Sequence, residues 1–266
     1  MKRVSLSLVV AGLTAIFAFG QKRETRSVSG FTGIDASSVF NITVTRGGTE
    51  SLIIEADDAV MPYVLSEVRN GVLHLYIDRD HQVKSIKTLN ASIVMRNLDH
   101  VSLSGTCKLT ANDQFTPDKF KGDCSGVSNL TVNLSTGELN IFASGASKIQ
   151  VKANVTGDAK VDVSGTSKFQ GELKAVHLSI NSSGVSAMDI TGSAADVKIS
   201  SSGTSKINAP NFAVRTATVE SSGTSKIALN VEEFLIVNSS GASSVEYKGS
   251  PVITAKTGGT SKVRKI

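Results

Sequence analysis

The sequence predicts an all-β fold, a right-handed parallel β-helix (β-solenoid) with about 19 residues per rung. Composition is the first reason: 266 residues include 23 Gly and no Trp, and only 5% are aromatic, which suits tightly turning strands of small residues. The second reason is an internal repeat of the form SG-x-S-K-apolar. Its nine glycines are Gly105, Gly126, Gly145, Gly165, Gly184, Gly203, Gly223, Gly241 and Gly259.

Residues 1–20 have the pattern of a signal peptide. A basic start, MKR, precedes an apolar run over residues 4–19, and Ala18-Phe19-Gly20 offers a small-x-small cleavage site. The alternative is a membrane anchor, which the polar residues within the run and the following QKRETR disfavour. We expect an exported protein of the periplasm, cell surface or extracellular space, with no membrane span after cleavage. Losing Lys2 and Arg3 lowers the net charge from +5 to +3, too little to indicate a nucleic-acid partner.

Residues 21–97 lack the repeat and are expected to form a strand-rich capping section of the same domain. Alternating apolar residues predict strands at 40–44, 51–56, 72–77 and 91–95. Between the second and third of these, valines recur at every fourth position of residues 60–68. Asp57 and Asp58 can cap a helix there, and Asn70-Gly71 can end it. The pattern therefore predicts one short helix.

Residues 98–266 carry the repeat, and its internal pattern predicts strands. The residue four after each glycine is apolar, and the residue four before it is apolar or small, with polar residues alternating between them. Two strands and a corner fill about 19 residues, so no helix fits in a unit. One unit cannot bury its apolar row alone, and stacked units at roughly 4.8 Å each would form a rod about 40 Å long. A left-handed hexapeptide helix is disfavoured because the spacing drifts between 18 and 21 residues.

The repeat makes two further predictions about the corners. The glycine of each unit is expected to take a positive φ, where a side chain would be strained. Serines before and two after the glycine are expected to stack, hydroxyl above hydroxyl, along the rod.

The segments VSGFTGIDASSVFNITVTRG and SLIIEADDAVMPYVLSEVRNGVLHLYI, followed by the SGxSKI units, resemble the head GIN domain family of putative auto-transporter adhesins, common in Bacteroidetes. The resemblance extends over nearly all of the chain after the signal peptide. It implies an exported β-helix and a role in adhesion.

The lysines three residues after the repeat glycines are the first candidate ligand-binding residues. Lys148, Lys168, Lys206 and Lys226 would form a basic stripe, with Lys108 and Lys262 at its ends, able to hold an acidic polysaccharide or a lipid headgroup. Asn129, Ala187 and Ser244 interrupt the stripe. The alternative is a solvated face on which these interruptions relieve repulsion between like charges.

Carboxylates three residues before the glycines are the second candidate. Asp123 and Asp162 would lie two rungs apart, near the upper limit of roughly 9.5 Å for paired catalytic carboxylates. We interpret Asp162 with Lys168, and Glu220 with Lys226, as ion pairs across one corner. No nucleophile motif, cofactor motif, or zinc-ligand spacing of Cys and His is present.

Cys107 and Cys124 fall at inward positions on adjacent rungs. In an oxidising compartment they could form a disulfide. Alternatively, they are two small buried residues in serine-sized positions.

These observations favour a non-enzymatic binding or structural module, adhesin-like, that contacts polysaccharide or a cell-surface protein. Few aromatics suggest narrow rungs without room for large rings, which would place any function on the outer faces. The alternative is a carbohydrate-active β-helix lyase or hydrolase. Unprotected rod ends also make a homo-oligomer a hypothesis.

Overall fold

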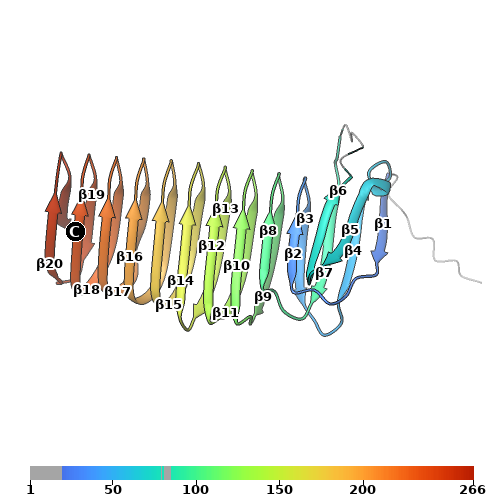
Figure 1. The fold of residues 1–266 in the computed structure, drawn as a ribbon, viewed down its shortest axis with the longest axis horizontal. Coiled ribbons are helices and arrows are strands. Elements are labelled where there is room, and N and C mark those ends of the chain that lie inside the picture. The colour runs from blue at the N-terminus through green and yellow to red at the C-terminus, as the bar shows by residue number, and fades with distance from the viewer. Residues whose placement is uncertain (1–19, 79, 81–84) are drawn as a thin grey trace, which may run out of the picture.

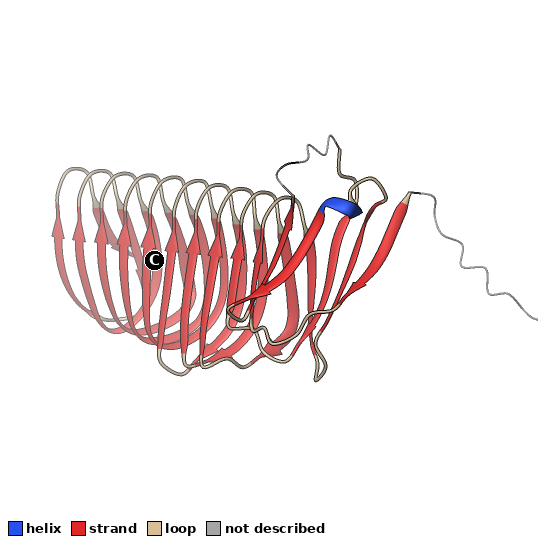
Figure 2. Ribbon diagram, turned by 45° about the vertical axis from the view of Figure 1, so that its right-hand side comes forward, coloured by secondary structure: helices blue, strands red, loops and turns tan. Residues whose placement is uncertain are grey.

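Strands make up most of the chain (Figures 1 and 2). The computed structural model describes residues 20–78, 80 and 85–266, so the predicted signal peptide, apart from Gly20, lies outside the described residues. Within the described part, no helix has the length and hydropathy of a membrane span.

The chain winds through two sheets that face each other across the core. The upstream sheet leads into each glycine corner. Its order is β5 (Val64–Arg69), β6 (Val72–Ile77), β2 (Gly33–Ala36), β8 (His100–Leu103), β10 (Lys119–Cys124), β12 (Glu138–Ala143) and β14 (Asp158–Val163), then the second halves of β15 (Lys168–Ser182), β16 (Ala187–Ser201), β17 (Lys206–Ser221) and β18 (Lys226–Ser239), then β20 (Val252–Thr257).

The downstream sheet leads away from each corner. Its order is β1 (Gln21–Arg26), β4 (Ser51–Asp57), β7 (Leu89–Met95), β3 (Asn41–Arg46), β9 (Lys108–Phe115), β11 (Asn129–Thr136) and β13 (Lys148–Val155), then the first halves of β15 to β18, then β19 (Ser244–Lys248) and β21 (Lys262–Lys265). From β2 and β3 onward the pairings within both sheets are parallel, as the repeat predicts. In Figure 1 the near strands run up and the far strands run down while the chain advances to the left, which makes the solenoid right-handed.

The predicted corners are present, and they stack into one continuous ladder (Figure 2). All nine repeat glycines have φ between 68° and 76°. The N–H that follows each glycine donates to the corner carbonyl of the preceding rung at 2.6–2.8 Å. A Cβ built on any of these glycines would lie 2.4–2.6 Å from that same carbonyl oxygen. Glycine is therefore required both by its own backbone and by its neighbour.

The four predicted N-terminal strands form, as β3, β4, β6 and β7, whereas β1, β2 and β5 were not predicted. The predicted helix does not form. Only a single 3-10 turn occurs, at Met61–Tyr63, with Pro62 in its first turn. Val64 is already extended and begins β5, which pairs antiparallel with β6 through the two-residue turn Asn70-Gly71. Both turn residues have positive φ, the conformation that an Asn-Gly hairpin turn requires. The hairpin explains why the helix prediction was wrong.

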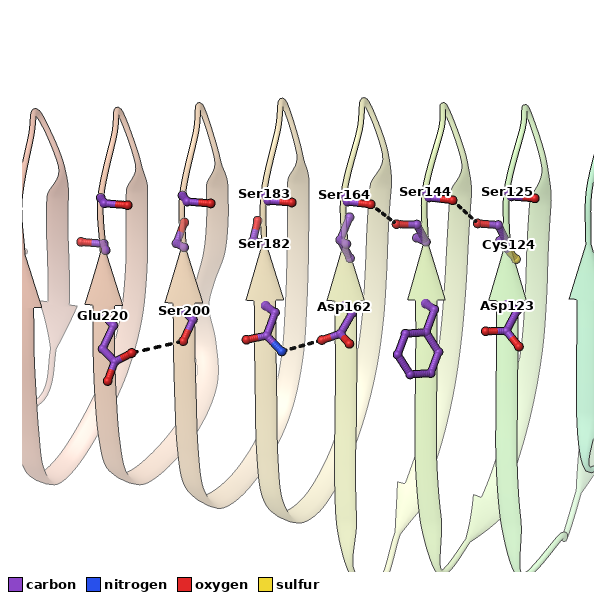
Figure 3. Close-up of a pocket in the computed structure, with 18 of the residues that line it drawn as sticks. Asp123, Cys124, Ser125, Ser144, Asp162, Ser164, Ser182, Ser183, Ser200 and Glu220 are labelled. Carbon is purple, nitrogen blue, oxygen red and sulfur yellow. Dashed lines mark hydrogen bonds between the residues drawn. The ribbon is translucent and has the colours of Figure 1, made fainter.

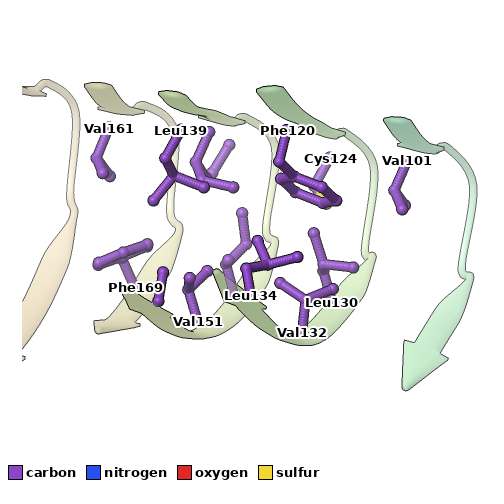
Figure 4. Packing of buried hydrophobic residues seen from close by; sticks show 14 of the residues in the cluster. Val101, Phe120, Cys124, Leu130, Val132, Leu134, Leu139, Val151, Val161 and Phe169 are labelled. Carbon is purple, nitrogen blue, oxygen red and sulfur yellow. The ribbon is translucent and has the colours of Figure 1, made fainter. Parts of the chain in front are cut away.

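The core runs along the rod between the two sheets (Figure 4). The expectation of rungs too narrow for large rings was wrong, because the fully buried side chains include Phe31, Phe40, Phe115, Phe120, Phe169 and Phe212. Neighbouring glycines make the room. A Cβ on Gly171 would lie 2.6 Å from the Phe169 ring, and one on Gly122 would lie 3.2 Å from the Phe120 ring.

We predict that Gly165→Ala destabilises the rod by at least about 1–2 kcal/mol, the cost of a left-handed backbone for a residue with a side chain. The new methyl would also press on the Gly145 carbonyl oxygen, 2.4 Å away, which is backbone and has no freedom to rotate aside. Urea unfolding followed by circular dichroism measures the loss.

Gly258→Ala is the matched control, because Gly258 has no positive φ and a Cβ there would meet nothing within 4 Å. Equal unfolding midpoints for the two variants would show that the corner does not require glycine.

Candidate binding groove

The residues three before the repeat glycines form one outward-facing column on the upstream sheet. Strand register aligns each member with the next, so the column continues without a break across eight rungs. Its members over these rungs are Ser102, Asp123, Phe142, Asp162, Asn181, Ser200, Glu220 and Asn238, and Lys256 continues the column on β20 beside Asn238. Hydroxyl, carboxylate and amide groups therefore follow one another along the rod.

A second column runs beside the first, made by the serines that directly precede the corners. Together the two columns line a shallow groove of about 670 Å³, which we call the serine groove (Figure 3). Its serines are Ser125, Ser144, Ser164, Ser183, Ser202, Ser222 and Ser240. The groove is open to solvent along its length and lies on the outer face, not in the core.

Serine hydroxyls in both serine columns bond mainly to backbone carbonyls, not to each other as expected. In the groove, Ser144 donates to the Cys124 carbonyl at 3.4 Å and Ser164 to the Ala143 carbonyl at 3.2 Å, each on the preceding rung. Two residues after the corner, Ser147 is buried and donates to the Ser144 carbonyl at 2.7 Å. Hydroxyl pairs do form deeper in the later rungs, as between Ser221 and Ser239 at 2.9 Å. The serines therefore help to hold the corners in place.

Two of the three groove carboxylates pair with lysines two residues earlier on the same strands, whereas Glu220 lies 3.9 Å from Lys198 on the preceding rung. Asp123 pairs with Lys121 at 2.8 Å, and Asp162 pairs with Lys160 at 3.1 Å. The Asn181 side chain also donates to Asp162 at 2.5 Å, as Figure 3 shows. These contacts fix the carboxylate oxygens as acceptors along the groove.

The predicted ion pairs of Asp162 with Lys168 and of Glu220 with Lys226 were wrong. Lys168 lies near Asp189 at 3.8 Å, and Lys226 contacts Glu246 at 3.2 Å. The reason is geometric: the acidic residues face outward from the upstream sheet, whereas these lysines face outward from the downstream sheet. Each acidic residue and its lysine are six positions apart in the sequence, and the corner between them places their side chains on opposite sides of the rod.

Phe142 is the one groove residue that does not match its polar column, and it was not singled out from the sequence as a candidate. It is only half-buried, although the other large apolar residues of its strand point into the core. The ammonium groups of Lys121 and Lys160 lie 5.6 and 5.4 Å from its ring centroid, within cation–π range. An outward aromatic in a column of polar residues is the sequence signal that could have identified it.

The lysine column forms on the downstream sheet with the predicted register. Lys148 lies beside Lys168, and Lys206 beside Lys226. Lys168 and Lys226 contact carboxylates on the same sheet, as described above. Lys148 and Lys206 have no ion-pair partner among the described residues.

Cys107 and Cys124 are free, buried thiols, and the bridge considered from the sequence is not formed in this structure. Cys124 is stacked between Leu103 and Ala143 in the upstream sheet, whereas Cys107 follows the corner, in line with Ser128. Burial raises the pKa of Cys107 to about 11 and that of Cys124 to about 12. Within the described chain, no group of three or more His, Cys, Asp or Glu side chains is arranged as metal ligands.

Solved structures share this fold. A putative adhesin from Parabacteroides merdae aligns with a TM-score of 0.72 at 18% identity, over 93% of this chain and 97% of that chain. A putative adhesin from Parabacteroides distasonis gives 0.67 at 17% identity, over 92% and 97%. A putative lipid binding protein from the same species gives 0.67 at 16% identity, over 93% and 97%. At these identities the likeness establishes the fold alone.

A family model described as "Putative auto-transporter adhesin, head GIN domain" matches residues 30–157 and 151–251. The two matched segments together take in most of the chain. No curated protein matches it.

We predict that both thiols resist modification in the folded protein at pH 8 and react together on unfolding. With a pKa of about 11, only about one Cys107 thiol in a thousand is ionised at that pH, and burial also blocks access. A thiol reagent added with and without urea, followed by mass measurement, tests this. Rapid labelling of the native protein, or no labelling after unfolding without reductant, would contradict it.

Proposed function

Because the chain belongs to the head GIN domain family of putative auto-transporter adhesins, we propose that it is an exported, adhesin-like module that binds a glycan or a cell-surface protein on an outer face of the solenoid. The serine groove is the observation that supports this proposal best. Its column spans eight rungs from Ser102 to Asn238, which is about 34 Å at roughly 4.8 Å per rung. A groove of that length suits an extended, repeating ligand.

The chemistry of the groove favours a hydroxyl-rich ligand. Asp123, Asp162 and Glu220 accept hydrogen bonds, Asn181 and Asn238 can donate them, and the serines can do both. Sugar hydroxyls need this mixture of donors and acceptors, and the apolar C–H face of a sugar ring can pack against the half-exposed ring of Phe142. Carboxylates along the groove also disfavour a strongly acidic chain. We therefore propose a neutral glycan as the groove's ligand.

The lysine column remains the proposed contact for an acidic ligand. Lys148 and Lys206 have no ion-pair partner among the described residues, so they could each contact an anionic group at little cost. Lys168 and Lys226 would first have to leave Asp189 and Glu246. The two proposed contacts lie on opposite outer faces, so variants can separate them.

We predict that Phe142→Ser weakens binding to the neutral glycans that the exported protein retains on a glycan array. Serine is the residue of the same column at Ser102 and Ser200, so the change should preserve the fold. Loss of about 1.4 kcal/mol of ring contact would lower affinity about tenfold. Titration of the best neutral glycan measures the change.

Lys148→Gln combined with Lys206→Gln is the control and should leave this binding unchanged. If the array instead retains only acidic glycans, and this double variant loses them at low salt, the ligand belongs on the lysine column. If the protein cleaves a bound polysaccharide and Asp162→Asn abolishes the cleavage, the carbohydrate-active enzyme replaces the binding module. If no glycan binds, the groove proposal fails and a protein ligand remains.

A further inference from the structure

The last rung of the solenoid, residues 247–266, has a charge unlike that of the rest of the chain. It contains five cations and no acidic residue. The net charge of the whole chain is +5, of which residues 1–20 contribute +2, so residues 21–246 sum to −2. The cations are Lys248, Lys256, Lys262, Arg264 and Lys265. Positive charge is therefore concentrated at one end of the rod.

Apolar side chains are exposed at the same end. Val252 is 67% exposed and Ile266 52%, and on the adjacent strand Phe234 is 50% and Ile236 47% exposed. Register places Phe234 beside Val252, on the outer face of the upstream sheet. Ile253 lies beside the buried Leu235 but is itself 38% exposed. Half of the large apolar side chains exposed in the described chain lie at this end.

The rung before this patch is polar at the same positions. Thr216 aligns with Phe234, and Thr218 aligns with Ile236. The outer face of the upstream sheet is thus polar from β14 to β17 and becomes apolar at Phe234, Ile236 and Val252. Single exposed apolar residues need no explanation, but a contiguous patch on a monomer usually marks a contact surface.

Most cations of the last rung are available to a ligand. Arg264 contacts Glu246, which Lys226 also contacts, and Lys265 donates to Ser250 at 3.2 Å. Lys248, Lys256 and Lys262 have no ion-pair partner among the described residues and are exposed. The exposed acidic residues nearest in sequence to the last rung, Glu232 and Glu233, directly precede Phe234. With these two included, the net charge of residues 224–266 is +3.

We propose that this end of the rod docks on the surface of an anionic lipid bilayer. Cations near such a surface are attracted to its headgroups, and apolar side chains beside them can enter the boundary between headgroups and acyl chains. A soluble polyanion would use the lysines but not the apolar patch. A second copy joined through the same C-terminal end would bring five cations against five. The combination of charge and apolar surface therefore fits a lipid surface best.

Vesicle co-sedimentation of the exported protein tests the proposal, with phosphatidylcholine vesicles compared with vesicles that also contain phosphatidylglycerol. We expect binding to the anionic vesicles, weakened by salt, and none to the neutral ones. Two variants should each lower binding at least tenfold. One is Lys248→Gln with Lys256→Gln and Lys262→Gln, and the other is Phe234→Thr with Ile236→Thr, which copies the preceding rung.

The matched control replaces three exposed lysines on the side of the rod that lie outside the lysine column, Lys87→Gln with Lys152→Gln and Lys174→Gln, and should retain binding within twofold. Circular dichroism of every variant confirms that the fold is kept.

Four results would overturn the proposal. The first two are equal binding to neutral and anionic vesicles, and no binding to either. The third is an equal loss of binding in the side-of-rod control. The fourth is that the protein binds inorganic polyphosphate as well as anionic vesicles, and that the threonine variant weakens neither. A dimer in sedimentation that the threonine variant dissociates, without any vesicle binding, would assign the patch to a second copy instead. None of these outcomes depends on whether a glycan binds in the serine groove.

Discussion

The corner ladder is the constraint on which the rest of the structure depends. Each corner carbonyl accepts the N–H of the next rung at 2.6–2.8 Å, and the close approach leaves no room for a Cβ between successive corners. Because the corners stack so closely, the strands on both sides are brought into register over most rungs. Because the strands are in register, residues at equivalent positions of successive rungs form columns along the rod. Two such columns line the serine groove. A surface feature about 34 Å long therefore follows from a backbone contact repeated once per rung.

The repeat was sufficient to predict the corners, the parallel sheets and the inward rows, because each unit repeats one local pattern whose copies confirm one another. The N-terminal section has no such redundancy. Valines at every fourth position suit one face of a helix, but they also fall on one face of a strand, where every second residue points the same way. Asn70-Gly71 was the feature that distinguished the two, since it closes a two-residue hairpin between Arg69 and Val72. Local spacing alone was ambiguous there.

Other features depend on how residues are arranged in three dimensions, which their spacing in the sequence does not reveal. Asp162 and Lys168 are near in sequence, yet the corner between them sends their side chains to opposite sides of the rod. The buried rings depend on pairs such as Phe169 and Gly171, in which a missing side chain provides the volume that the ring fills. Phe142 differs from its column only because the neighbouring members are polar, and the strand register is needed to identify those neighbours. Composition correctly indicated a β-rich rod but underestimated the size of side chain that its core accepts.

The contacts between corners have a direction along the rod. A Cβ at a corner would point toward the preceding rung, so each rung needs its own glycine in order to stack on the rung before it. The corner glycine of a rung places no such requirement on its own contact with the rung that follows. Ser38 forms the corner on which Gly105 stacks, and it combines a φ of 87° with a side chain. A duplicated unit could therefore be appended at the C-terminal side carrying only its own glycine. The length of such rods can change in evolution without redesign of the rungs already present.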